Sequence, residues 1–143
     1  MNKLFSTNPI LLKSGLTVIR IIVGFFLVYH GWEVFDKNKM NEYIAWDVFK
    51  GFSSPSFMVY IGKSAELVAG FLLAIGLFSR IACIIIIGTF IYISCFVGHG
   101  KIWYEDQYPF LFALFGCVFF FTGPGKWSVD NLIVRSSKTV RSS

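Results

Sequence analysis

Charged residues are scarce in this chain, and their scarcity argues against a soluble globular protein. Asp, Glu, Lys and Arg make up 15% of its 143 residues, whereas hydrophobic residues make up 55% and aromatic residues 19%. A soluble domain of this size has too small an interior to bury so much apolar surface. The composition therefore predicts a protein that is surrounded largely by lipid.

Side chains for metal binding and thiol chemistry are also few. Cys83, Cys95 and Cys117 all fall in apolar stretches and form no Cys-x-x-Cys pair, as a disulfide-exchanging membrane enzyme would require. The two histidines, His30 and His99, lie in different apolar stretches, at depths that do not suit a shared haem. We also find no Gly-rich phosphate loop and no Ser/His/Asp set. We therefore expect no metal site and assign no catalytic residue.

Long hydrophobic stretches dominate what the sequence does contain. Four of them can be drawn, at about residues 14–35, 57–78, 81–98 and 107–122. Each approaches the ~20 residues with which a helix crosses the hydrocarbon core of a bilayer. We predict an all-α fold, an integral membrane four-helix bundle with up-down-up-down topology, as a single domain over residues 1–135. A basic, disordered tail is expected at residues 136–143.

The distribution of Lys and Arg predicts the orientation of the bundle. The side that holds both termini and the turn at residues 78–80 carries eight of these residues: Lys3, Lys13, Arg20, Arg80, Lys126, Arg135, Lys138 and Arg141. The two loops on the other side carry four: Lys37, Lys39, Lys50 and Lys101. The positive-inside rule places both termini in the cytoplasm. Basic segments beside anionic headgroups explain the net charge of +5, so we expect no nucleic-acid partner.

Two pairs of ionisable residues fall inside predicted spans. Lys63 and Glu66 are three residues apart in the second span, where charges are costly unless they are paired. His30 and Glu33 lie near the outer end of the first span. At 1.5 Å per residue, His30 and Lys63 should both lie roughly 8–9 Å below the outer ends of their spans. The matching depths predict one shared site, with a Lys63–Glu33 or a His30–Glu66 contact.

Aromatic residues and a second histidine are expected around this site. The candidate ligand-binding residues are His30, Glu33, Lys63, Glu66 and His99, with aromatic walls from Tyr29, Trp32, Tyr60, Trp103 and Tyr104. Such a pocket would suit an amphipathic ring, and a quinone headgroup is the obvious ligand. Two simpler interpretations stay open: the charges lock helices together, and His99 is an ordinary interfacial histidine.

The long outer loop at residues 36–56 contains a further aromatic pattern. Tyr43, Trp46 and Phe49 recur every three residues, which is typical of a short amphipathic helix at the membrane interface. Such a helix could be a plain interfacial anchor, the interpretation we favour, or a cap over a cavity.

Three sequence blocks together resemble the DoxX family of small four-span membrane proteins, from Arg20 to Asp130. They are Arg20-Ile-Ile-Val-Gly24 followed by His30-Gly31; Gly62-Lys63-Ser-Ala-Glu66-Leu-Val-Ala-Gly70 followed by Leu73-Ala-Ile-Gly76-Leu-Phe-Ser-Arg80; and Gly123-Pro124-Gly125-Lys-Trp-Ser-Val-Asp130. The chain departs from the family in one place, because Val34 stands where members commonly have a lysine four residues after the histidine.

The resemblance implies a role rather than a proven activity. It implies an integral membrane subunit or accessory of a quinone-linked redox system, for thiol, sulfur or oxidative-stress chemistry, in the bacterial cytoplasmic membrane. A redox partner subunit, soluble or membrane-bound, and a homo-oligomer are the expected partners besides the bilayer. The family's motif residues carry over as Arg20, His30, Lys63, Glu66, Arg80 and Asp130, and Gly123, Pro124 and Gly125 belong to the third matching block. Arg80 and Asp130 are expected to pair at the inner end.

The site residues can be given roles under this hypothesis. Lys63 or His30 would donate a hydrogen bond to a quinone carbonyl, and Glu66 would orient Lys63 or relay a proton. Two alternative functions remain: a non-catalytic membrane scaffold or chaperone-like partner, and, with less support, a small-solute transporter. Four short spans without an internal repeat offer little basis for alternating access.

Overall fold

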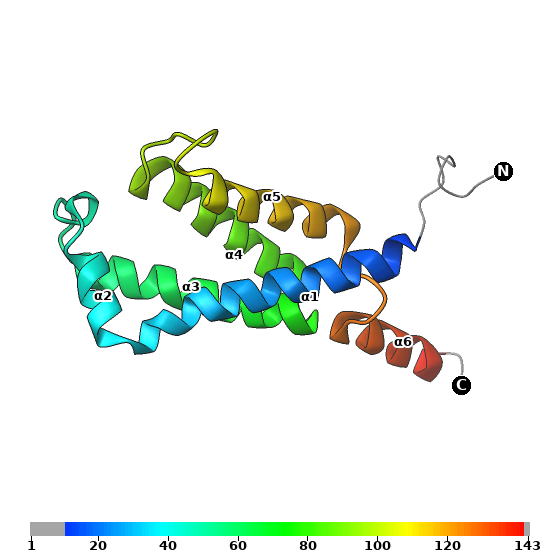
Figure 1. The fold of residues 1–143 in the computed structure, drawn as a ribbon. Helices are drawn as coiled ribbons and strands as arrows, with labels where there is room; N and C mark the ends of the chain where they lie inside the picture. The colour runs from blue at the N-terminus through cyan, green and yellow to red at the C-terminus, as the bar shows by residue number, and fades with distance from the viewer. Residues whose placement is uncertain (1–10, 142–143) are drawn as a thin grey trace.

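The computed structural model of the protein describes residues 11–141, with side chains described up to Ser136. Lys3, counted above among the inner-side charges, lies outside the described residues. The fold is all-α, as predicted, with six helices in the described chain (Figure 1). They are α1 (Leu12–Gly31), α2 (Lys37–Ile44), α3 (Pro55–Ile75), α4 (Ser79–Tyr92), α5 (Gln107–Thr122) and α6 (Val129–Arg141).

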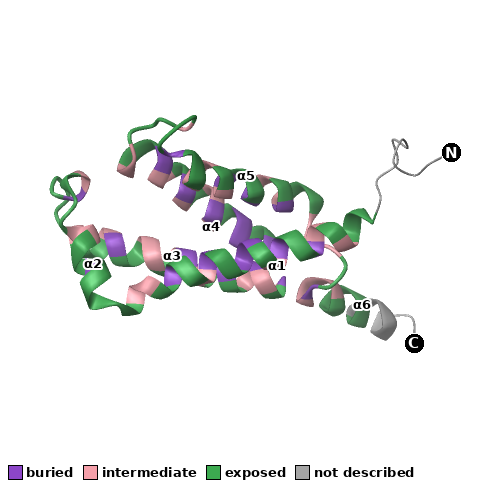
Figure 2. Ribbon diagram, in the orientation of Figure 1, coloured by how far each residue is buried: buried purple, intermediate pink, exposed green. Residues whose placement is uncertain are grey.

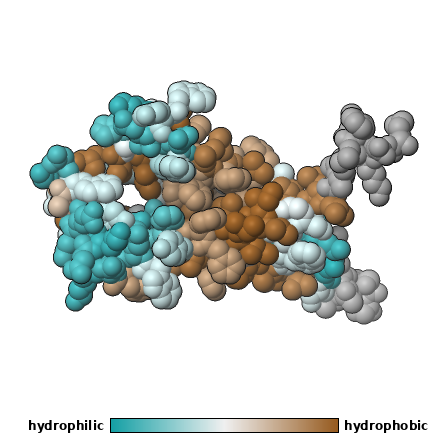
Figure 3. Space-filling model, in the orientation of Figure 1, coloured by the Kyte–Doolittle hydropathy of each residue, from teal (hydrophilic) through white to brown (hydrophobic). Residues whose placement is uncertain are grey.

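Three helical stretches are long and apolar enough to cross a membrane. They are Leu12–Phe35, Pro55–Ile75 and Ser79–Val97, and α5 is a shorter apolar helix that coincides with the fourth predicted span. The second span ends earlier than predicted, because Gly76 adopts a left-handed conformation (φ 71°) that terminates α3. Apolar residues form a broad band over the middle of the molecule, and polar residues gather at the end that carries α2 (Figure 3).

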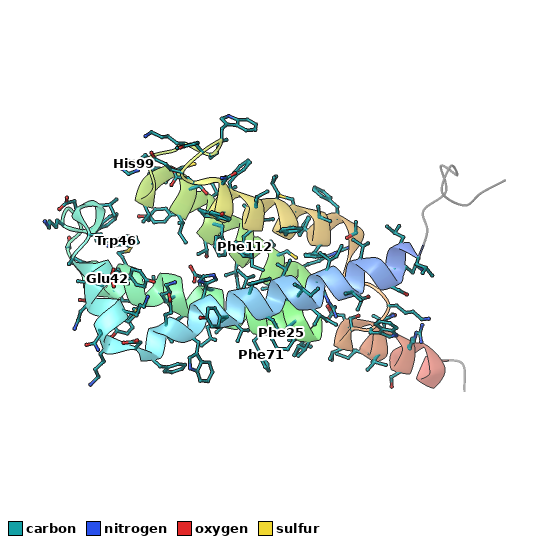
Figure 4. The ribbon with its side chains drawn as sticks, viewed as in Figure 1. Phe25, Glu42, Trp46, Phe71, His99 and Phe112 are labelled. Atoms are coloured by element: carbon teal, nitrogen blue, oxygen red, sulfur yellow. The ribbon has the colours of Figure 1, made fainter. Side chains whose placement is uncertain are left out.

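The helices form two closely packed pairs (Figure 1). α1 lies antiparallel to α3, and α4 forms a hairpin with α5. Buried residues follow the lines along which the helices meet (Figure 2). The main cluster comprises Val23, Leu27, Ala69, Leu73, Ala82, Cys83, Ile86, Phe90, Ala113 and Phe119. Outward-facing positions such as Phe25 and Phe71 are more than half exposed, as expected of lipid-facing side chains (Figure 4).

Glycines bring α1 and α3 into backbone contact. A Cβ atom on Gly24 would lie 2.6–2.8 Å from the backbone and Cβ of Ala74, and one on Gly70 would lie 2.6–3.0 Å from Leu27 and Val28. Such separations are too short for any side chain, so only glycine permits this approach. The pairing of α1 with α3 therefore depends on small residues at fixed positions.

We call the end with α2 the outer end and the end with α6 the inner end, following the predicted orientation. At the outer end the chain leaves α1 through a 3₁₀ turn, η2 (Trp32–Phe35), and enters α2, which Asp36 caps by accepting hydrogen bonds from the amides of Asn38 and Lys39. A second 3₁₀ turn, η3 (Asp47–Phe49), follows. Met40, Phe49 and Val59 form a buried cluster that fastens this segment to α3.

The second outer loop is organised by one carboxylate. α4 ends in a π-helical turn, η4 (Ile93–Val97), after which Asp106 accepts hydrogen bonds of 2.9 Å from the amides of His99 and Lys101. Gly98 packs so closely on this carboxylate that a side chain there would collide with it. The loop is therefore a fixed structure that determines where His99 lies.

The inner end is closed by the segment after α5. Gly123 and Gly125 both have φ near 80°, which lets the chain reverse and return to α1. Arg20, which is 1% exposed, donates a 2.6 Å hydrogen bond from Nη2 to the carbonyl of Trp127. Arg20, Trp127 and Asp130 together hold the inner end to the turn between α3 and α4, at residues 76–78. We call this set of contacts the inner latch.

Asp130 joins α6 to the turn between α3 and α4. Its carboxylate accepts hydrogen bonds from the amides of Phe78 (2.8 Å) and Ser79 (2.9 Å), and so caps the start of α4. The pairing with Arg80 that we expected is wrong, because the carboxylate points to these amides and its cationic neighbour is Arg20, while Arg80 is exposed. Burial by itself would raise the pKa of Asp130, but these amide hydrogen bonds and the charge of Arg20 outweigh it and lower the pKa below its ordinary value.

The Asp130→Ala variant should lose stability in a way that depends on pH. Loss of the cap should lower the free energy of unfolding by about 1–2 kcal/mol at neutral pH. Because the pKa of Asp130 is lowered by folding, its contribution is complete above about pH 4 and is lost as the pH falls through the folded-state value. Thermal unfolding from pH 7 to about pH 3 should show the two proteins converging in acid. A difference that stayed constant would contradict an ionised cap.

The last helix extends further than the sequence analysis suggested. α6 runs through Arg141, whereas we expected disorder from residue 136. The helix is amphipathic, with acidic Asp130 in its first turn. It lies at the same end of the bundle as the start of α1 (Figure 1). The cytoplasmic location of this end stays a prediction.

Candidate functional site

Lys63 is at the centre of an ion-pair network inside the outer half of the bundle. Its Nζ atom lies 2.9 Å from Oε2 of Glu33 and 3.1 Å from Oε2 of Glu66. A third, longer contact of 3.4 Å reaches the main-chain carbonyl of His30. The side chains are little exposed, at 15% for Lys63, 22% for Glu33 and 6% for Glu66. The Lys63–Glu33 contact expected from matching depths is therefore formed.

The structure explains how a turn of α3 can hold these charges in an apolar environment. Lys63 and Glu66 are three residues apart on α3 and so lie on the same side of the helix. Gly31, just before η2, packs so tightly on the backbone of Leu67 that the end of α1 is pressed against this turn. That contact brings Glu33 within reach of Lys63, which adds a second carboxylate to the Lys63–Glu66 pair.

Tyr43 extends the network from the outer loop. Its hydroxyl donates a 2.7 Å hydrogen bond to Oε2 of Glu33, and its ring lies 5.0 Å from Nζ of Lys63. This distance is within the range of a cation–π contact. Burial, followed by the hydrogen bond and the negative charge of Glu33, raises the pKa of Tyr43 above its ordinary value. Tyr43 therefore remains a neutral hydrogen-bond donor over the physiological pH range.

His30 takes part through its backbone. Its carbonyl accepts from Lys63, while its exposed imidazole packs edge-on against the ring of Tyr29, with centroids 5.7 Å apart. No direct contact joins the imidazole to Glu66 in the described part of the chain. The predicted role of His30 as a ring donor thus has less geometric support than that of Lys63.

A cavity of about 470 Å³ lies beside the network, between α3 and α4 and beneath η3. It is lined by Tyr43, Trp46, Phe49, Met58, Val59, Ile61, Gly62, Lys63, Ala65, Glu66, Gly88, Thr89, Tyr92, Ile93 and Val97. Its volume is in the range of small-molecule sites, and most of its lining is apolar. Lys63 and Glu66 provide the charges in its wall. The aromatic part of the outer loop thus covers a cavity, which is the second of the two interpretations given above.

Several residues predicted for the pocket lie elsewhere. His99 is 76% exposed on the loop after η4, where its Nδ1 atom lies 3.5 Å from Oε2 of Glu105 (Figure 4). Trp103 and Tyr104 are more than three-quarters exposed on the same loop. The fixed loop around Asp106 holds this group away from the cavity, which depth alone did not reveal.

The expected aromatic walls are also replaced. Tyr29 and Trp32 line a separate hollow at the outer end of α1, which shares Glu33 with the ion-pair network. Tyr60 is 40% exposed and does not line the cavity. The walls come instead from Tyr43, Trp46, Phe49 and Tyr92. The three-residue spacing in the outer loop signalled the first three, whereas nothing in the apolar third span distinguished Tyr92.

The arrangement can bind a polar group and hold a proton. One ammonium between two carboxylates leaves an excess negative charge when all three groups are ionised, partly offset by Lys39, 3.9 Å from Glu33. Across the described chain, Oε1 of Glu66 has no hydrogen-bond partner, so it remains available to a bound molecule or a proton. Among residues 11–136, no cluster of His, Cys, Asp or Glu side chains suits a metal ion.

Comparison with known proteins adds one family assignment. Residues 15–100, more than half of the chain, match the sequence model of the family described as DoxX. The matched region contains α1 from its fourth residue onward and all of α2, α3 and α4, and with them the ion-pair network and every residue that lines the cavity. No curated protein and no solved structure matches the chain.

Proposed function

Because the chain belongs to the DoxX family of integral membrane proteins, we propose that it acts as a subunit or accessory of a quinone-linked redox system, with the cavity beside Lys63 and Glu66 as its quinone site. The observation that carries this proposal is a charged, hydrogen-bonded network in the wall of an otherwise apolar cavity, between helical stretches that are long and apolar enough to cross a membrane. Ionisable groups inside a membrane usually serve a function.

Each polar group has a role in this proposal. Lys63 would donate to a quinone carbonyl by exchanging its weakest contact, the 3.4 Å approach to the carbonyl of His30. Glu66 would keep Lys63 charged and oriented, and its unpaired oxygen could carry a proton to or from the ring oxygen. The aromatic side chains of Tyr43, Trp46 and Tyr92 would pack against the ring.

The test is the thermal stability of the purified protein in nanodiscs, with and without a short-chain quinone. Binding to the folded state should raise the midpoint of wild type, by an amount equivalent to about 2.7 kcal/mol at a hundredfold excess over Kd. In Glu66→Gln the rise should be absent, because an amide replaces the carboxylate that orients Lys63 and carries the proton in this proposal. Glu105→Gln, on an exposed outer loop, is the matched control and should respond as wild type does. An unchanged response in Glu66→Gln would refute the assignment.

A second candidate function is a non-catalytic scaffold or chaperone-like partner protein. The observation in its favour is that Lys63 also joins Glu33 at the end of α1 to Glu66 in α3, as a structural lock would. This function predicts that Glu66→Ala has a lower thermal unfolding midpoint than wild type when no quinone is present. It also predicts that quinone changes the midpoint of neither wild type nor Glu66→Ala. The same nanodisc measurement thus separates the two functions.

A further inference from the structure

We propose that the cavity is entered sideways from the lipid, through the cleft between α3 and α4, by a membrane-dissolved molecule with an apolar tail. Its ring would reach Lys63 and Glu66, and its tail would remain in the cleft. The inference rests on the proposed function. It adds the route of entry and the class of ligand, which is a tailed quinone rather than a water-soluble substrate.

Helical spacing identifies the rim of the cleft. Ile61 and Ala65 are four residues apart on α3, and Gly88 and Tyr92 are four residues apart on α4, so each pair forms a row along its helix. Ile61 is 53% exposed and Gly88 is exposed, although both line the cavity. The two rows therefore border the cavity on the side where the bundle faces lipid.

Polarity changes from the rim to the interior. One position further along the chain are Gly62 and Glu66 on α3, Thr89 on α4 and Ile93 at the start of η4, which also line the cavity. Glu66 is 6% exposed, in contrast to the exposed rim. A molecule that enters from the lipid would meet apolar side chains first and the charged network last. This order suits an amphipath with a polar ring and an apolar tail.

Packed residues border other parts of the cavity. Toward the outer end, Phe49 packs with Val59, Met58 and Val97, and this cluster closes the space beneath η3. Toward the inner end, fully buried residues of α3 and α4 fill the space between the helices: Ala69, Leu73, Ala82 and Ile86. The glycine contacts also leave no passage between α1 and α3. The exposed rim residues Ile61 and Gly88 therefore mark the lipid side as the approach in this proposal.

Gly62 provides a position at which the passage can be plugged. A Cβ atom there would meet nothing within 4 Å, so a larger side chain would extend into the cavity without disturbing the packing. Ser64, two residues along the same helix, is exposed and does not line the cavity. Gly62→Leu and Ser64→Leu therefore place the same side chain inside the passage and outside it.

The experiment compares two probes in nanodiscs, a benzoquinone with a decyl tail and the same ring with a methyl group. Wild type should bind the decyl probe at least about tenfold more tightly than the methyl probe. Gly62→Leu should lose about tenfold or more in affinity for the decyl probe, and Ser64→Leu should keep wild-type affinity. Unchanged binding of the decyl probe by Gly62→Leu would overturn the route while leaving the quinone site intact. No binding of either probe by wild type would refute the proposed function as well.

A labelling experiment gives a readout that does not depend on the stability of any variant. A decyl quinone with a diazirine at the end of its tail should, after irradiation of the wild-type protein, modify residues 61–65 and 88–92. Labels on α2 or on the loop at residues 98–106 would place the tail at the outer aqueous side and overturn the proposal.

Discussion

The Gly24→Ala variant should be destabilised by about 3 kcal/mol or more, although it adds a single methyl group. The added atom would lie 2.6 Å from the amide nitrogen and 2.7 Å from the Cα of Ala74, so relief requires α1 and α3 to separate. Overpacking in a core usually costs about 1–3 kcal/mol, and a collision with backbone belongs at the upper end because backbone has no alternative rotamer. The measurement is the unfolding midpoint in a fixed detergent, compared with wild type.

The same helix offers a matched control. A Cβ atom on Gly15 would meet nothing within 4 Å, so Gly15→Ala should be neutral or should stabilise the protein by up to about 1 kcal/mol through its helix propensity. If Gly24→Ala unfolded at the same temperature as Gly15→Ala, the folded protein could not have α1 and α3 in backbone contact at Gly24.

The Arg20→Met variant should lose about 2–3 kcal/mol of stability through the inner latch. Methionine retains much of the volume but leaves the carbonyl of Trp127 without its 2.6 Å hydrogen bond and Asp130 without its cationic neighbour. This loss of stability is smaller than the loss on removing an arginine whose nitrogens are all hydrogen-bonded, since Nε and Nη1 of Arg20 have no partner among the described residues. Denaturant unfolding in detergent measures the change.

Arg80 is the control for this second variant, because it is an exposed arginine at the same end of the bundle. Arg80→Met should change the free energy of unfolding by no more than about 0.5 kcal/mol. Equal losses in the two variants would mean that positive charge at the inner end, rather than the latch, supplies the stability.

The helices were predictable from the sequence because lipid imposes a strong and simple constraint. A stretch that crosses the hydrocarbon must be apolar and helical, so the predicted spans agree closely with the helical stretches Leu12–Phe35 and Ser79–Val97 and with α5. The late end assigned to α3 was wrong because hydrophobicity continues through Leu77 and Phe78, whereas the backbone turns at Gly76. The extension of α6 was missed because its serine-rich and basic composition gives no hydrophobic run.

The sequence predicted how deep the site residues lie along their helices, but not which way their side chains and loops face. Counting residues from the span ends correctly brought Lys63 to Glu33. The same counting placed His99 at the outer end without showing that Asp106 turns its loop away. It also could not distinguish Arg20 from Arg80 as the neighbour of Asp130, since both lie at the inner level and only the helix face decides.

The position of Lys63 and Glu66 on one turn of α3 bears on how the chain enters the membrane during synthesis. The two residues lie 3.1 Å apart within a single helix, so they neutralise each other without help from any other span. An inserting α3 therefore carries a compensated pair rather than two separate charges. The contact with Glu33 differs, because it needs the end of α1 to lie against this turn of α3. One ion pair of the network thus requires a single helix, and the other requires two helices to associate.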